Sequence, residues 1–127
     1  MINALFNQPN YQAARKMLDA TVLRHEAIAS NIANLETPNY KRLDVSTNFQ
    51  SELSRAVANK DPNQIASLRP SIEVDPNAAA ENKDGNSVQL ENELLQLSQN
   101  SLTHTATTQM LTGTFLKLRM AITGRSV

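Results

Sequence analysis

Two long stretches in which apolar residues recur alternately three and four positions apart constrain the fold of this chain most. The first starts after Pro9 and has these residues on one face: Tyr11, Ala14, Leu18, Thr21, His25, Ile28, Ile32 and Leu35. This spacing, kept over several heptads, is typical of a helix that packs lengthwise on another helix. The sequence therefore predicts a helix over residues 9–36.

The second stretch follows Asp84-Gly85-Asn86-Ser87, a turn signal whose last residue is a candidate helix cap. Its face comprises Leu90, Leu94, Leu97, Ser101, His104, Thr108, Leu111, Phe115, Leu118 and Ile122. A second apolar row, which includes Leu102 and Met110, makes this face wider than one partner helix needs. Gly124 predicts the helix stop. We expect a helix of about 36 residues, buried on more than one side by other helices.

Between these stretches the periodicity fades. Residues 49–57 could form a short amphipathic helix, and residues 65–74 could pair as short strands. We predict an all-α fold in which two long terminal helices pack as an antiparallel coiled coil around a mostly irregular central segment. The predicted parts are an N-terminal helix with a turn motif (1–43), an extended and partly disordered centre (44–87) and a C-terminal helix (88–127). The two helices form one domain.

Composition excludes several classes of function. The 12 acidic and 12 basic residues cancel, which argues against a nucleic-acid partner. The absence of cysteine excludes disulfides and thiolate metal sites. No run approaches the ~18 apolar residues of a membrane span. The first residues lack the charged and long apolar regions of a signal peptide, so we expect none.

The sequence offers no catalytic or cofactor-binding constellation. His25 and His104 fall midway along the two predicted helices and could face each other, but two histidines without a carboxylate do not make a metal site. We expect packed or interfacial histidines, with a pH-sensitive contact as the alternative. The basic pairs Arg15-Lys16 and Lys41-Arg42 are expected to be solvated or at the rim of a contact. We predict no enzymatic activity, no metal and no cofactor.

Residues 30–42 combine a helix end and a turn. Asn31 and Asn34 fall on the last helical turn, and Pro38 then breaks the helix because proline lacks an N–H and restricts the residue before it. Asn39 follows, a residue type that tolerates positive φ. The two asparagines are either ordinary helix-end polar residues or ligands of the turn backbone or a neighbouring subunit. Tyr40 is either an anchor of the turn or a subunit contact.

This stretch also carries a family resemblance. Its matching residues are Asn31, Ile32, Ala33, Asn34, Thr37, Pro38, Tyr40 and Lys41. Together they resemble the motif of the flagellar axial proteins, the family of rod, hook and hook-associated proteins. Asn39 stands where that family often has glycine, a mild departure because asparagine also tolerates positive φ. The short chain and its pattern over residues 10–57 and 84–123 narrow the resemblance to proximal rod proteins of the FlgB type, with the FlgC type as runner-up.

The resemblance implies a structural subunit that assembles with copies of itself and with other rod proteins, including the FlgC type, into part of the drive shaft and export channel used for motility. It also implies contacts with a FliE-type adaptor, the MS ring and the export gate. The location would be the rod of the basal body, in the periplasm. The flagellar type III system would export the chain without a cleaved signal peptide.

Two interpretations compete for the pair Phe49 and Leu53. Their spacing is similar to the export-gate recognition motif of early rod and hook substrates, but it also suits one face of a short helix. A second class of function competes with the rod subunit as a whole. A cytoplasmic coiled-coil adaptor or regulatory binding module would show the same long apolar helices.

Overall fold

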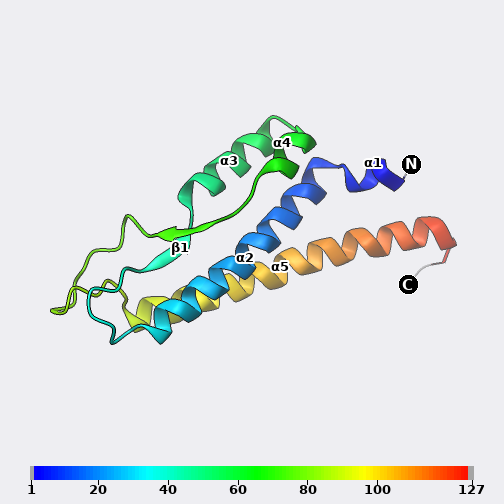
Figure 1. The fold of residues 1–127 in the computed structure, drawn as a ribbon. Coiled ribbons are helices and arrows are strands. Elements are labelled where there is room, and N and C mark those ends of the chain that lie inside the picture. Colours follow the sequence, from blue (N-terminus) through cyan, green and yellow to red (C-terminus); the bar gives the residue numbers. More distant parts are fainter. Residues whose placement is uncertain (1, 126–127) are drawn as a thin grey trace.

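The computed structural model describes residues 2–125 and is built on two long helices that lie side by side (Figure 1). The helices are α1 (Ile2–Phe6), α2 (Pro9–Ala33), α3 (Thr47–Ala58), α4 (Pro62–Ser67) and α5 (Leu90–Thr123). The strands are β1 (Leu43–Val45) and β2 (Ile72–Val74). The described part of the chain is therefore mostly helical, with one small antiparallel sheet.

The two long helices run in opposite directions. Asn31 near the end of α2 bonds Glu93 near the start of α5, whereas Tyr11 near the start of α2 contacts Phe115 towards the end of α5. Gly124 ends α5 as predicted, with a φ of 64° and its N–H bonded to Met120 O. Both predicted long helices are confirmed, but each has one boundary to correct.

Each boundary differs from the prediction because of hydrogen bonds that the spacing of apolar residues does not report. Helix α2 ends at Ala33 instead of residue 36, since the Asn34 N–H already bonds in the tighter pattern of a last turn and Thr37 bonds back to Asn34. Helix α5 begins at Leu90 instead of residue 88. Ser87 is not its cap, because the Ser87 hydroxyl accepts the backbone N–H of Arg42.

The centre of the chain is more ordered than the prediction of a mostly irregular segment. The short helix expected at 49–57 is present as α3, and α4 follows it. Strand β2 pairs with β1 in an antiparallel register that places Asp44 opposite Glu73. The all-α prediction therefore omits a small sheet. The expectation of strands at 65–74 is correct for 72–74 and wrong for Ile65, which lies in α4.

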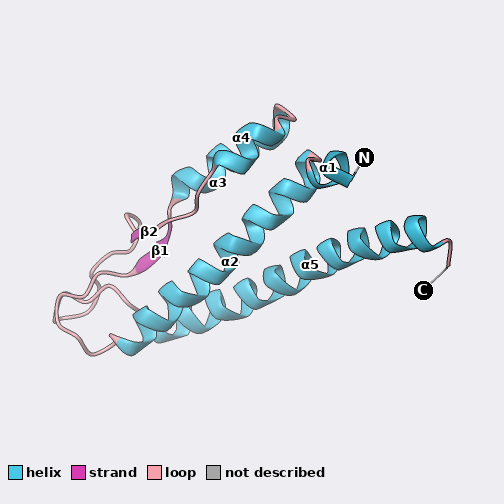
Figure 2. Cartoon of the chain, turned by 45° about the vertical axis from the view of Figure 1, so that its right-hand side comes forward, coloured by secondary structure: helices cyan, strands magenta, loops and turns pink. Residues whose placement is uncertain are grey.

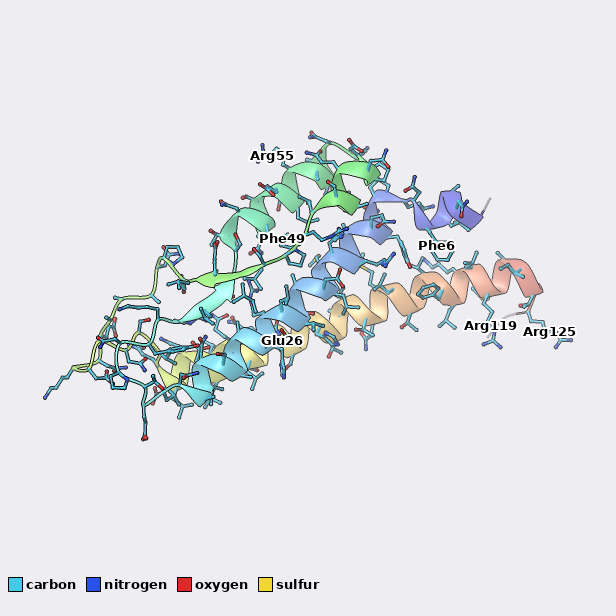
Figure 3. The ribbon with its side chains drawn as sticks, viewed as in Figure 1. Phe6, Glu26, Phe49, Arg55, Arg119 and Arg125 are labelled. Carbon is cyan, nitrogen blue, oxygen red and sulfur yellow. The ribbon has the colours of Figure 1, made fainter. Side chains whose placement is uncertain are left out.

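A small apolar core explains this order. Phe49, Leu53 and Ala56 on α3 pack with Ile65 of α4 against the Ala13 side of α2. Figure 3 shows Phe49 between α3 and α2, and Figure 2 shows both short helices on that side of α2. Burying several side chains at about 25 cal/mol per Å² of apolar surface stabilises short helices that would not persist alone.

Helix α5 remains partly uncovered. It contacts α2, but its second half extends past the core formed by α3 and α4 (Figure 1). Large apolar residues of α5 are exposed: Leu90, Leu94, Leu95, Leu102, Met110, Phe115, Leu116, Met120 and Ile122. None of the helices in the described range 2–125 is long and apolar enough to cross a membrane.

Candidate functional site: a polar joint between the long helices

The end of α2, the following turn and the start of α5 are held together by buried polar side chains. We call this region the joint and define it as residues 30–45 and 82–93. Asn31, Asn86 and Glu93 lie within it with 0% of their surface exposed. Buried amides and carboxylates are costly unless they are hydrogen-bonded, so their partners define what the region does.

The Asn31 side chain makes two hydrogen bonds to β1 of the kind that the backbone of a neighbouring strand would make. Its Oδ1 accepts the N–H of Leu43 at 2.8 Å, and its Nδ2 donates to the carbonyl of Leu43 at 2.9 Å. The same Nδ2 also donates to Glu93 Oε2 at 3.1 Å. One side chain of α2 therefore fixes the strand and the start of α5 together. A sequence can suggest that such a residue is important without showing these partners.

Arg42 is the centre of an ion-pair network. Its Nε bonds Glu93 Oε1 at 2.6 Å, and one terminal nitrogen bonds Asp44 at 3.1 Å and Asp75 at 2.8 Å. Arg24 on α2 adds a bond to Asp44 at 2.9 Å. The expectation that Arg42 is solvated is wrong, because three carboxylates from three segments surround a side chain that is only 11% exposed.

The network shifts the pKa of two of its members. Burial acts to lower the pKa of Arg42, but hydrogen bonds to Glu93 and Asp44 outweigh burial and raise it. Burial acts to raise the pKa of Asp44, but Arg24, the Val45 N–H and Arg42 outweigh burial and lower it. Both shifts favour the charged forms, which are the forms that make the network.

Asn86 bonds the C-cap residue of α2 and the turn that follows it, although these residues lie about fifty positions earlier in the sequence. Its Nδ2 lies 2.9 Å from Asn34 O, 3.1 Å from Leu35 O and 2.8 Å from Thr37 O. Its Oδ1 accepts the N–H of Val88 at 2.7 Å. These three carbonyls belong to the C-cap residue of α2 and to the turn that follows it, so a residue from the approach to α5 holds this turn in place.

The turn after α2 is fitted closely against the segment 82–88. Asn39 has a φ of 60°, and its N–H bonds Asp84 O at 3.0 Å. Gly85 has a φ of 78°, and a Cβ there would lie 2.4 Å from Asn39 Oδ1. Ser87 N–H bonds Tyr40 O at 3.1 Å. Glycine at 85 is therefore favoured by its backbone conformation, and a Cβ there would also have to displace the Asn39 side chain.

Comparison with known proteins identifies the family. Residues 13–41 match the family described as flagella basal body rod protein. The chain is 29% identical to the flagellar basal body rod protein FlgB of Borrelia hermsii, over 86% of this chain and 92% of that protein. It is 32% identical to FlgB of Borreliella burgdorferi, over 70% of this chain and 77% of that protein. The chain belongs to the FlgB family of flagellar basal body rod proteins. FlgB of Bacillus subtilis is also similar, at 29% identity over 89% of this chain.

The family motif lies at the joint of this FlgB-family chain. Asn34 donates to Ser30 O at 2.8 Å, and Thr37 donates to Asn34 Oδ1 at 3.1 Å. Tyr40 OH lies 2.9 Å from Ser30 Oγ and 3.4 Å from Asn31 Oδ1, so it anchors the turn. The remaining motif residues contribute less to the network: Ile32 is half-buried, Ala33 and Pro38 are exposed, and Lys41 reaches Gly85 O at 3.3 Å.

The residues expected at a helix-packing interface divide into two groups. Ile28 and Leu111 are buried, and Tyr11, Leu18, Ile32, Leu35, Leu97 and Leu118 are half-buried. Leu90, Leu94, Phe115 and Ile122 are exposed. The face that α5 turns to α2 is partly polar, since Glu93, Asn100 and Thr107 are buried at intervals of seven residues. Their interface role in an assembly stays a prediction.

The two histidines line one groove between α2 and α5, together with Thr21, Glu26 and Asn100. His104 Nδ1 lies 3.0 Å from Thr21 Oγ1, and Asn100 donates to Thr21 O at 2.8 Å. Within residues 2–125, no group of three or more histidine or carboxylate side chains could hold a metal ion. The interaction of His104 is with a hydroxyl group of the facing helix.

Sequence reasoning missed Arg42, Asp44, Asp75, Glu93 and Asn86 as site residues. Several of their contacts join distant parts of the sequence. Arg42 bonds Asp75 and Glu93, and Asn86 bonds Asn34, across separations of 33 to 52 positions. Periodicity reports only local structure, so it cannot reveal such pairs. The one available signal was Glu93, an acidic residue that falls in the first turn of α5 and on its buried side.

Proposed function

We propose that this FlgB-family chain is a structural subunit of the proximal rod that assembles by helix packing with copies of itself and with other rod proteins. The observation that carries the proposal is the uncovered apolar surface of α5. Leu102 is 72% exposed and Ile122 is 68% exposed, within a series of exposed apolar residues along the helix. A series of exposed large apolar side chains along one helix supports an interaction surface.

The proposed mechanism assigns different tasks to the two ends of the helix pair. The joint fixes α2 and α5 to each other through buried polar contacts within one chain. Beyond the joint, α1 and the exposed apolar residues of α5 from Leu102 to Ile122 are offered to neighbouring subunits. In the assembled rod we propose that α2 and α5 form an antiparallel coiled coil whose outer apolar rows are covered by helices of other subunits.

The partners we propose are a FlgC-type rod protein, a FliE-type adaptor, the MS ring and the export gate, with the assembled tube serving as drive shaft and export channel. The proposed location is the periplasmic part of the basal body. Export would proceed through the flagellar type III system without a cleaved signal peptide. Support for these assignments is the membership of the chain in a family of basal body rod proteins.

Export-gate recognition through Phe49 and Leu53 requires an unfolded chain. Both side chains are buried in the core between α3 and α2, so a gate cannot contact them in the folded protein (Figure 3). Ile65 is buried in the same core but lies outside the motif, which makes it a matched control. Loss of secretion in Phe49→Ala with normal secretion of Ile65→Ala supports recognition. Equal secretion of both variants removes the idea.

Rod packing is tested by placing a charge on the uncovered face of α5. Leu102→Glu should abolish incorporation into basal bodies while leaving the helical content of the purified protein unchanged, because Leu102 contributes little to the fold of one chain. Ser98→Glu, at another exposed position on α5, is the control and should assemble. Fractionation of cells provides the measurement. A wild-type chain found only in the soluble fraction would instead favour the coiled-coil adaptor.

A further inference from the structure

The two edges of the small sheet differ in whether their outward backbone groups are hydrogen-bonded within the described residues. Backbone bonds from Asp75 N to Arg42 O and from Ser46 N to Ser71 O set the ladder, so Asp44 and Glu73 face each other as a hydrogen-bonded pair. The backbone groups of Leu43 and Val45 therefore point outward from β1. Those of Ile72 and Val74 point outward from β2 on the opposite edge.

Side chains of the same chain bond three of the four outward backbone groups of β1. Asn31 bonds both the N–H and the carbonyl of Leu43, and Asp44 Oδ1 accepts the N–H of Val45 at 2.6 Å. The outer edge of β2 has no such cover within residues 2–125, where no group bonds the outward N–H or carbonyl of Ile72 or Val74. An open edge of this kind is a template for another strand.

Two prolines define the length of the open edge. The outward positions along this segment alternate as Pro70, Ile72, Val74 and Pro76, and prolines have no N–H to donate. Only Ile72 and Val74 therefore offer both an N–H and a carbonyl, which makes four backbone groups for a full strand pairing. The two side chains share one face of the sheet, and Val74 is 53% exposed. A short added strand would bond the backbone and cover this apolar pair.

The opposite face of the sheet, which carries Glu73, favours a particular charge in an added strand. Glu73 is exposed, and among the described residues it forms no ion pair. Its cross-strand neighbour Asp44 is already bonded by Arg24 and Arg42. A residue added directly opposite Glu73 would lie about 4.5 Å from it, Cα to Cα. A lysine or arginine is favoured at that distance and an acidic residue is disfavoured.

We propose that β2 binds an extended segment of another protein by strand addition, and that this segment has the pattern apolar, basic, apolar. The apolar residues would lie beside Ile72 and Val74, and the basic residue would face Glu73. A second copy of β2 is the wrong occupant, because antiparallel pairing through all four groups would place two Glu73 side chains opposite each other. The proposal concerns the central segment and goes beyond packing of the long helices.

Photo-crosslinking in cells tests the edge and the rod surface separately. A photoreactive amino acid in place of Val74 keeps the backbone N–H and should crosslink to a segment of another protein that has a basic residue between two apolar residues. The same group in place of Leu102 reports helix packing. Absence of a Val74 adduct, an adduct with a second copy, or an adduct with a helix overturns strand addition. Absence of a Leu102 adduct counts against the proposed rod packing instead.

Charge substitutions at Glu73 provide the second readout in the same experiment. Glu73→Lys should lower the yield of the Val74 adduct by about fivefold or more, because attraction becomes repulsion across the new strand pair. Glu73→Gln should lower it by about twofold. The exposed position of Glu73 leaves the fold intact in both variants. Equal yields from all three proteins would overturn the assignment of a basic residue to the partner.

Discussion

The two ends of the α2–α5 pair differ in how completely contacts within one chain bond their polar groups and cover their apolar side chains. At the joint, Asn31, Asn86 and Glu93 are fully buried and every one of them is hydrogen-bonded within the chain. At the other end, Phe6, Tyr11 and Phe115 form a small cluster with ring centroids 5.4 to 6.2 Å apart, and apolar residues beyond it are exposed. The difference teaches that the buried polar groups of the joint are satisfied within a single chain, whereas apolar side chains at the other end are left uncovered by it.

The nature of the contacts explains this division. Polar networks need specific geometry, so they fix a unique arrangement of segments that are distant in sequence. Apolar contacts are non-directional and can be completed by any helix that brings a matching surface. Arg119 and Arg125 extend from the far end of α5, in the region that the core of α3 and α4 does not reach (Figure 3). A subunit that must join neighbours is well served by a rigid joint and an uncovered end.

The largest expected effect breaks the joint. Glu93→Ala removes the buried carboxylate that bonds Arg42 and Asn31, and it should lower the free energy of unfolding by about 3–5 kcal/mol. Urea unfolding monitored by circular dichroism measures the loss. Glu91→Ala, at an exposed position in the same helical turn, is the control and should cost less than about 1 kcal/mol. Equal losses in both variants would mean that the joint is not a special region.

A smaller effect is expected at the other end. Phe115→Ala removes contacts with Phe6 and Tyr11, but Phe115 is 46% exposed, so the loss should be about 1–2 kcal/mol. Thermal and urea unfolding of the purified protein provide the measurement. Leu102→Ala should change the stability by less than about 0.5 kcal/mol. A loss from Phe115→Ala as large as that from Glu93→Ala would remove the contrast between the two ends.

The smallest expected effect is on the loss of folding stability at low pH. The pKa of Asp44 is lower in the folded protein than in the unfolded chain, so its stabilising contribution is present above the unfolded value near 4 and is lost as pH falls towards the folded value. Asp44→Asn should reduce the acid-induced loss by about 1 kcal/mol. Urea titrations between pH 7 and pH 3 measure it, with Glu52→Gln as the exposed control. If Asp44→Asn loses as much stability between pH 7 and pH 3 as the wild-type protein does, the pairing of Asp44 with Arg24 and Arg42 is contradicted.

Sequence reasoning succeeds here where structure is local. The spacing of apolar residues predicts α2 and α5, Gly124 predicts the end of α5, and the spacing of Phe49 and Leu53 predicts α3. It fails where partners are distant. The position of Asn86 in the sequence indicates a turn residue, yet its side chain bonds the turn after α2, about fifty residues earlier in the sequence.

The register of α5 shows a second limit. Its apolar residues occupy more than one face, so the pattern Leu90, Leu94 and Leu97 predicted one side as the contact with α2. The structure buries Glu93 and Asn100 on that contact, with Leu97 half-buried between them. The side-chain hydrogen bonds that Glu93 and Asn100 make with α2 favour this register, and hydropathy does not report them. The exposed leucines remain available to other chains.

Hydrogen exchange on the isolated protein tests the central claim most directly. Amides of α2 near Asn31 and of α5 near Glu93 should be protected, and those of residues 112–123 should exchange at least about 100-fold faster, because few buried contacts hold that part of α5. In purified basal bodies the second group should become as protected as the first. Uniform protection along all of α5 in the isolated protein would contradict the account, since no part of the helix would then depend on partners.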